Sequence, residues 1–164
     1  MRCILGSTMG RRRTTILLVV AMMSVASTSR AERTSSIYLE AFGKGGIWGV
    51  GYDHRLDERF RLGIVGSAER FGGENYVALA PYLGLTILRH GHSSWFADFG
   101  GQFAYVWASS PVPEWDGESS AGIGGIVSTG YEFRARVVFR LYVHGAVGKG
   151  GLLPWAGTGI GWAF

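Results

Sequence analysis

The chain has 164 residues, of which 47% are apolar, only 17% are charged, 27 are glycine and one is cysteine. This composition excludes an intrinsically disordered chain, and a single cysteine excludes a disulfide framework or a cysteine-rich zinc module. The length suits one domain, and the formal net charge of +4 would by itself suggest an acidic partner such as nucleic acid.

The first 31 residues have the three parts of a secretory signal peptide. Basic residues come first, an apolar run follows at 16–26, and the small residues Ser29 and Ala31 precede the expected cleavage site. The apolar run is too short to cross a bilayer as a helix, which argues against an N-terminal anchor. Removal of 1–31 takes away Cys3 and five arginines but no acid, so 11 basic and 12 acidic residues remain, a net charge of −1. We therefore expect no nucleic-acid partner.

From residue 34 to 164 the sequence alternates between bulky apolar residues and small or polar ones, the period-two pattern of β-strands. No window shows a convincing apolar stripe at helical spacing. Turn-rich breaks divide the segment into eight expected strands, most of them long for a soluble sheet and long enough to cross a bilayer when tilted. Their expected bounds are 36–43, 46–56, 59–70, 75–89, 94–108, 121–134, 137–148 and 152–164.

The direction in which the bulky residues face decides between a soluble β-sandwich and a membrane barrel. A soluble sheet needs a charged outer face, which this chain is too poor in charge to supply, whereas a transmembrane barrel turns bulky residues to lipid and small or polar ones to its lumen. Aromatic residues near the strand ends match the interfacial girdles of such barrels, although Tyr76 falls on the other face. The girdle candidates are Trp48, Trp95, Tyr105, Trp107, Tyr131, Phe133 and Trp162. The sequence thus predicts an all-β fold, an eight-stranded antiparallel transmembrane β-barrel at 34–164 preceded by a cleavable signal peptide at 1–31.

The connections between strands can be assigned to the two sides of the membrane. An exported barrel starts in the periplasm, which places 43–46, 71–74, 109–120 and 149–151 outside. The longest connection, 109–120, is the candidate for external contact because it sets an exposed tryptophan among acids and prolines; its candidate residues are Pro113, Glu114, Trp115 and Asp116. The glycine-rich stretches around Lys44 and Lys149 precede no helix, so they are expected to form hairpin turns and not phosphate-binding loops.

The lumen-facing set carries most of the polar chemistry. Charges in a narrow protein interior must be paired, so we expect a structural polar network that plugs the lumen. Its expected members are Glu40, Asp53, Arg55, Arg61, Asp98, Gln102, Glu132, Arg140, Tyr142 and His144. A small gated pore is the alternative for this region. The outer half of the lumen is more apolar and could hold an acyl chain, or could simply be filled; it contains Val65, Ser67, Ala104, Val106, Ile126, Ala146, Leu153 and Trp155.

No residue is assigned a catalytic, cofactor-binding or metal-binding role. His90 and His92 are expected in a periplasmic turn, and two histidines are too few for a structural zinc site. His54 is expected near the periplasmic end, and His144 is expected to face the lumen without a serine neighbour. A nucleophile needs its base within hydrogen-bond reach, so a hydrolase is disfavoured.

The C-terminal strand ends with Ile160, Trp162 and Phe164 on one face, with phenylalanine as the last residue. This pattern resembles the terminal signature of bacterial outer-membrane β-barrels, and the whole segment resembles the small outer-membrane protein A/X/W type of barrel. The resemblance implies residence in the outer membrane of a Gram-negative bacterium, recognition by the barrel-assembly machinery, contact with outer-membrane lipid and lipopolysaccharide, and a monomer. It favours a non-enzymatic structural or surface-interaction role; the alternative is a lipid- or lipopolysaccharide-binding or -modifying barrel, similar to the deacylase and palmitoyltransferase barrels. No cofactor is expected.

Overall fold

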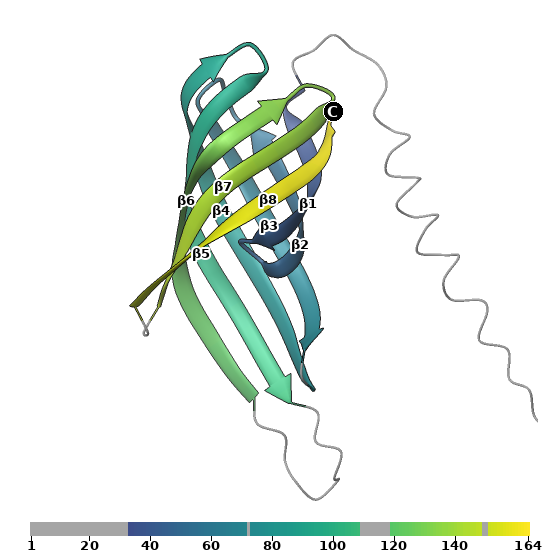
Figure 1. Ribbon diagram of the computed structural model, residues 1–164, viewed down its shortest axis with the longest axis vertical. Coiled ribbons are helices and arrows are strands. Elements are labelled where there is room, and N and C mark those ends of the chain that lie inside the picture. Colours follow the sequence, from purple (N-terminus) through teal and green to yellow (C-terminus); the bar gives the residue numbers. More distant parts are fainter. Residues whose placement is uncertain (1–32, 72, 109–118, 149–150) are drawn as a thin grey trace, which may run out of the picture. The chain divides into compact units, whose positions relative to one another are not determined.

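The computed structural model describes residues 33–71, 73–108, 119–148 and 151–164. These residues form eight strands: β1 (Ser35–Gly43), β2 (Gly46–Arg55), β3 (Phe60–Phe71), β4 (Glu74–His90), β5 (Ser93–Ala108), β6 (Ser119–Arg134), β7 (Val137–Gly148) and β8 (Gly151–Ala163). Each strand pairs antiparallel with the next, and β1 also pairs with β8, so the sheet closes into a barrel (Figure 1). The predicted eight-stranded antiparallel barrel is confirmed, with strand bounds that differ from the expected ones by at most two residues.

The signal peptide predicted at 1–31 lies outside the described residues. Within the part of the chain that the structure describes, no helix is long and apolar enough to cross a membrane.

The two faces of each strand differ in the way expected of a wall between lipid and a polar interior. On β7, Leu141 is 56% exposed on the outer face, whereas its neighbour Arg140 is fully buried on the inner face. On β8, Ile160 is 60% exposed, and on β1 Leu39 is 59% exposed beside the buried Tyr38. Large apolar side chains therefore cover the outside and charged ones fill the inside, the reverse of a soluble barrel.

Aromatic side chains lie on the outer face near both ends of the strands. Trp95, Tyr131 and Phe133 are exposed towards the end that the sequence assigns to the periplasm, called the periplasmic end below, and Trp48 and Tyr105 are exposed towards the other end. The Tyr131 hydroxyl and the Ser93 hydroxyl lie 2.6 Å apart. Amphipathic rings with a polar tip suit the boundary between lipid tails and headgroups. Five of the seven predicted girdle residues are thus exposed on the lipid-facing side, whereas Trp107 and Trp162 are half-buried, as is Tyr76.

The seam between β1 and β8 is closed by the backbone. Ile37 pairs with Trp162 and Leu39 pairs with Ile160 in the antiparallel register. Beyond these pairs, the Ser35 N–H donates to the Phe164 carbonyl (3.1 Å) and the Phe164 N–H donates to the Ser35 carbonyl (2.9 Å). The last residue of the chain therefore takes part in closing the barrel.

The strands differ in length around the wall. β1 and β2 have 9 and 10 residues, whereas β4 has 17 and β5 and β6 have 16 each. The β1–β2 hairpin consequently ends partway along the barrel, well short of the outer ends of β4 and β5 (Figure 1). The connection at 43–46 is a hairpin turn, as predicted. It does not form an outer loop but lies against lumen-facing residues: the Gly45 carbonyl accepts a hydrogen bond from the buried Ser67 (2.6 Å).

Candidate functional site

Glycines on neighbouring strands provide the space for large side chains inside the barrel. The register places Gly51 opposite Tyr38 and Gly63 opposite Tyr82. A Cβ atom on Gly51 would lie 2.1 Å from Cζ of Tyr38, and one on Gly63 would lie 2.2 Å from Cζ of Tyr82. Because only glycine leaves this space, both rings can lie against the neighbouring strand, and their hydroxyls meet 2.8 Å apart in the lumen.

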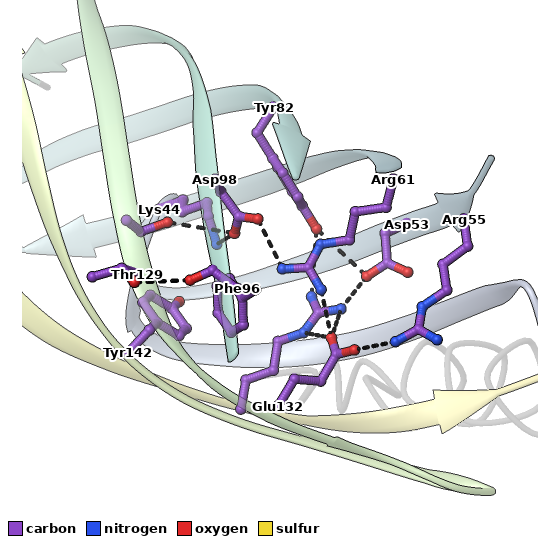
Figure 2. A network of polar contacts seen from close by, with 12 residues as sticks. Lys44, Asp53, Arg55, Arg61, Tyr82, Phe96, Asp98, Thr129, Glu132 and Tyr142 are labelled. Carbon is purple, nitrogen blue, oxygen red and sulfur yellow. Dashed lines mark hydrogen bonds and ion pairs between the residues drawn. The ribbon is translucent and has the colours of Figure 1, made fainter. Parts of the chain in front are cut away.

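Glu132 on β6 is the centre of the largest group of ion pairs. Its Oε1 lies 2.8 Å from Arg55 Nη2, and its Oε2 lies 2.7 Å from Arg61 Nη1 (Figure 2). Arg134 Nε lies 3.2 Å from Oε1, and Arg140 Nε lies 2.6 Å from Oε2. One fully buried carboxylate therefore joins arginines from β2, β3, β6 and β7. Charge-assisted contacts of this kind are stronger than neutral hydrogen bonds, particularly away from water.

Asp53 on β2 is the second acceptor of the cluster. Arg134 and Arg140 each pair with one of its oxygens through Nη2. The Ser36 hydroxyl donates to Oδ1 (3.1 Å), and the Tyr82 hydroxyl lies 3.5 Å from Oδ2. Asp53 is fully buried, so these donors replace the water that the carboxylate loses on burial.

Asp98 on β5 extends the cluster towards the outer end. Arg61 donates to Oδ1 through Nη2 (2.8 Å), and Lys44 Nζ lies 3.1 Å from Oδ2 (Figure 2). Lys44 also approaches Glu40, with Nζ 3.5 Å from Oε1, and Glu40 accepts a hydrogen bond from the Tyr142 hydroxyl. A continuous path of ionic contacts thus runs from Arg55 to Glu40.

The buried charges nearly balance. Among the described residues, the buried Asp, Glu, Lys and Arg side chains are four acids and five bases: Glu40, Asp53, Asp98 and Glu132 with Lys44, Arg55, Arg61, Arg134 and Arg140. Every acid contacts at least one cation, which offsets the large cost of taking a charge out of water. The cluster lies inside the barrel, where its carboxylates are almost completely shielded from water.

Eight of the ten residues predicted for the polar network are brought together. Seven are the predicted charged residues, and the eighth is Tyr142, which joins through Glu40. Gln102 lies at the edge, where its Nε2 donates to the Lys44 carbonyl (2.9 Å). His144 lies outside the network: it is 3% exposed, neither ring nitrogen has a hydrogen-bond partner among the described residues, and its ring packs edge-on against Trp155 with centroids 4.1 Å apart.

The sequence prediction missed two charged members, Lys44 and Arg134, and also Ser36 and Tyr82, which hydrogen-bond Asp53. Arg134 shares the inward parity of Glu132 and stands at the last position of β6, so the alternation could have found it. Lys44 stands in the β1–β2 turn, where alternation assigns no face.

The expectation that His144 has no serine neighbour is wrong. Antiparallel pairing of β6 with β7 places Ser128 directly opposite His144. The Ser128 hydroxyl, however, donates to Asp98 Oδ2 (3.4 Å). No described residue hydrogen-bonds the imidazole, so Ser128 is not paired with a base in this arrangement.

The remaining histidines lie at the periplasmic end. His54 Nδ1 lies 2.9 Å from the Ser35 hydroxyl, and His92 Nδ1 lies 3.2 Å from the Arg134 carbonyl. In the described part of the chain, no group of three or more His, Cys, Asp or Glu side chains is arranged to hold a metal ion.

The periplasmic turn between β2 and β3 is closed by Asp57. Its Oδ1 accepts hydrogen bonds from the N–H of Phe60 (2.6 Å) and of Arg59 (2.7 Å). These bonds favour the ionised carboxylate, so they hold the pKa of Asp57 below its ordinary value.

The residues predicted for the outer half of the lumen differ in their burial. Val65, Ser67 and Ile126 are buried, whereas Leu153 is 66% exposed at the outer end. Whether an acyl chain binds there stays a prediction. Of the predicted assembly signal, Ile160 and Phe164 are exposed on the outer face and Trp162 is half-buried beneath the Arg136 guanidinium, 5.0 Å from the ring centroid. The candidate contact residues Pro113, Glu114, Trp115 and Asp116 lie outside the described residues.

A closed antiparallel barrel with an apolar outer face, aromatic girdles and a charged interior is a small transmembrane β-barrel. The fold is similar to that of the N-terminal β-barrel domain of Pseudomonas aeruginosa OprF, with a TM-score of 0.63 and 12% identity over 81% of this chain and 98% of that domain. It is also similar to Ail, the attachment invasion locus protein of Yersinia pestis, with a TM-score of 0.53 and 11% identity over 80% of this chain and 94% of Ail. The resemblance to small outer-membrane barrels is thus confirmed at the level of the fold. No protein-family model matches the sequence, and no curated protein matches it.

Proposed function

We propose that this chain is a non-enzymatic outer-membrane β-barrel that closes its own lumen and offers its outer connections for surface contacts. The observation that carries the proposal is the buried cluster, in which Asp53, Asp98, Glu132 and Arg140 are all fully inaccessible to water. In a barrel whose interior holds paired charges, the interior has a structural role. Contacts with other molecules are then made by the ends and the outer face of the barrel.

The partners follow from the same division of the surface. The apolar outer face and the girdles suit outer-membrane lipid and the acyl chains of lipopolysaccharide. The exposed terminal face with Ile160 and Phe164 suits the barrel-assembly machinery during insertion. We propose a monomer, because β1 and β8 pair with each other from Ser36–Ala163 to Ala41–Thr158. Over this part of the seam neither strand has an open edge that could pair with a second chain.

The surface role is supported by similarity in fold, but the ligand chemistry differs. One structure of Ail is a complex with the heparin analogue sucrose octasulfate. In this chain the connection at 109–118 contains Glu114, Asp116 and Glu118 and no basic residue. A polysulfated ligand would be repelled by such a loop, so we do not extend that ligand to this chain.

Conductance tests the closed lumen. Purified barrel is inserted into a planar bilayer and current is recorded at voltages of both signs. We expect no steps above those of the bare bilayer, because an eight-stranded barrel has a narrow lumen and buried ion pairs lie within it. Reproducible unitary steps would contradict the closed lumen and support the small-pore alternative.

Deletion of residues 111–118 tests the surface role. Intact cells that produce either the wild-type chain or the deletion variant are compared for their sedimentation and for their retention on a hydrophobic surface. We expect both to decrease in the variant at equal amounts of folded barrel, measured by heat-modifiable migration in outer-membrane fractions. Equal sedimentation and equal retention would contradict a contact role for this loop.

A further inference from the structure

The β1–β2 turn carries a lysine into the lumen. Lys44 is completely buried, although it stands in the two-residue connection between Gly43 and Gly46 and not on a strand of the wall. The other buried cations of the described chain lie on strands. Lys44 is therefore the one buried cation in the described residues that the barrel wall itself does not position.

Four side chains from four strands surround the Lys44 ammonium group. Its Nζ lies 3.1 Å from Asp98 Oδ2 and 3.5 Å from Glu40 Oε1. It also lies 4.4 Å from the ring centroid of Tyr142 and 4.7 Å from that of Tyr82. Two carboxylates and two aromatic faces are the groups that proteins use to recognise ammonium ions. We call Glu40, Tyr82, Asp98 and Tyr142 the ammonium cage.

Few contacts hold the turn itself in the lumen. The Lys44 N–H donates to Glu40 Oε2 (3.2 Å), Gln102 donates to the Lys44 carbonyl (2.9 Å), and Ser67 donates to the Gly45 carbonyl. Immediately before the turn, Phe42 has a φ of 51°, the left-handed region that a bulky residue seldom adopts, and its side chain is 61% exposed. The backbone is thus bent at a conformational cost, which the binding of Lys44 in the cage offsets.

We propose that the ammonium cage is a binding site for a primary alkylammonium group, and that Lys44 fills it as a built-in ligand that holds the β1–β2 turn inside the barrel. The wall supplies the cage, and the turn supplies the occupant. A free primary alkylammonium ion of matching length fits the same cage once the Lys44 side chain is removed. This inference concerns the lumen alone and does not depend on the proposed surface role.

The first test measures the accessibility of Lys44 in the unaltered protein. The whole chain contains only two lysines, Lys44 and Lys149, so acetylation by an amine-reactive ester can be assigned to each by mass spectrometry. We expect Lys44 in folded barrel to be acetylated at least about tenfold more slowly than in urea-unfolded chain, because reaction requires the turn to open. In an Asp98→Asn variant, which weakens the cage, acetylation of Lys44 should accelerate. Equal rates for Lys44 in folded and unfolded chain would overturn the proposal.

The second test supplies the missing group from solution. Lys44→Ala removes three methylene groups and the ammonium, which together correspond to n-propylammonium. We expect this ion to raise the thermal unfolding midpoint of Lys44→Ala in a saturable manner, while n-propanol does not. Lys44→Met, which fills the space without a charge, should show no such rise, and Lys149→Ala serves as the control for loss of a lysine. If Lys44→Ala folds poorly, the yield of folded barrel with and without n-propylammonium becomes the readout. No difference between the ammonium and the alcohol in Lys44→Ala would overturn the proposal.

Discussion

Replacing Glu132 by glutamine removes the carboxylate on which the charged cluster converges. The side chain is fully buried, and four arginines lie between 2.6 and 3.2 Å from its oxygens. The amide keeps one acceptor oxygen but turns an NH₂ donor towards guanidinium donors. The buried set of four acids and five bases becomes three acids and five bases.

The size of the effect follows from the cost of leaving buried charge uncompensated. Removing one partner of a buried ion pair destabilises a protein by about 3–5 kcal/mol, and Glu132 contributes to more than one pair. We therefore expect Glu132→Gln to lower the free energy of unfolding by about 3–5 kcal/mol. Urea unfolding of barrels in lipid vesicles, followed by tryptophan fluorescence, measures this difference, since the chain contains six tryptophans.

Two further variants separate this reasoning from a general intolerance of substitution. Glu58→Gln makes the same chemical change at an exposed position and should stay within about 0.5 kcal/mol of the wild type. In a Glu132→Gln/Arg134→Gln double variant, removal of one excess cation should recover part of the loss. A loss below about 1 kcal/mol for Glu132→Gln would refute the view that this carboxylate stabilises the lumen.

Three further outcomes are expected. Gly51→Ala should lower the free energy of unfolding by about 1–3 kcal/mol because its Cβ would overlap a tyrosine ring, whereas Gly122→Ala, which has open space, should change it little; urea unfolding of both variants checks this. Phe99 lies at the centre of β5 and is 53% exposed on the lipid face, so Phe99→Arg should lower the free energy of unfolding in vesicles by about 2–4 kcal/mol. Leu88→Arg, near the periplasmic end of β4, should lower it by only about 0–1 kcal/mol in the same assay. Asp57 has a pKa below its ordinary 3.8, so its ionised form contributes stability above that pH and the contribution is lost as pH falls through the folded-state value. The difference in unfolding free energy between wild type and Asp57→Asn should therefore shrink below about pH 4, and a pH-independent difference would contradict the turn assignment.

Alternation along the sequence was sufficient to predict the wall of the barrel. Because the side-chain period of a strand is two, knowing that Leu141 faces lipid places Arg140 and Tyr142 inside. The same rule predicts that the charged side chains of the cluster that lie on strands face the lumen. It also predicts this for Arg134, which is two residues beyond Glu132 on the same strand. Closure of the barrel then brings residues that are far apart in sequence together across the lumen, such as Arg55 on β2 and Glu132 on β6.

Which residue contacts which could not be read from alternation. The pairing of Ser128 with His144 depends on the register of two strands, and the pattern of bulky and small residues allows more than one register where glycines are frequent. The position of Lys44 depends on the shortness of β1 and β2 relative to β4 and β5, and on a left-handed backbone at Phe42. Turn residues have no assigned face, so the sequence indicated a hairpin there without indicating that it enters the lumen.

The distribution of charge among the strands explains how a closed barrel and a charged interior coexist. Each of the seven strands β1 to β7 contributes a charged or phenolic side chain to the cluster, and the β1–β2 turn adds Lys44. In contrast, β8 presents Gly157, Gly159 and Gly161 opposite Tyr142, Arg140 and Val138. A Cβ on Gly157 would lie 2.9 Å from Cζ of Tyr142, so the glycine lets this ring reach Glu40 on β1. Side-chain links thus pass over β8 from β7 to β1, while β8 is joined to both neighbours through its backbone. Because β8 adds no charge to the lumen, it closes the barrel without disturbing the nearly balanced set of ions inside.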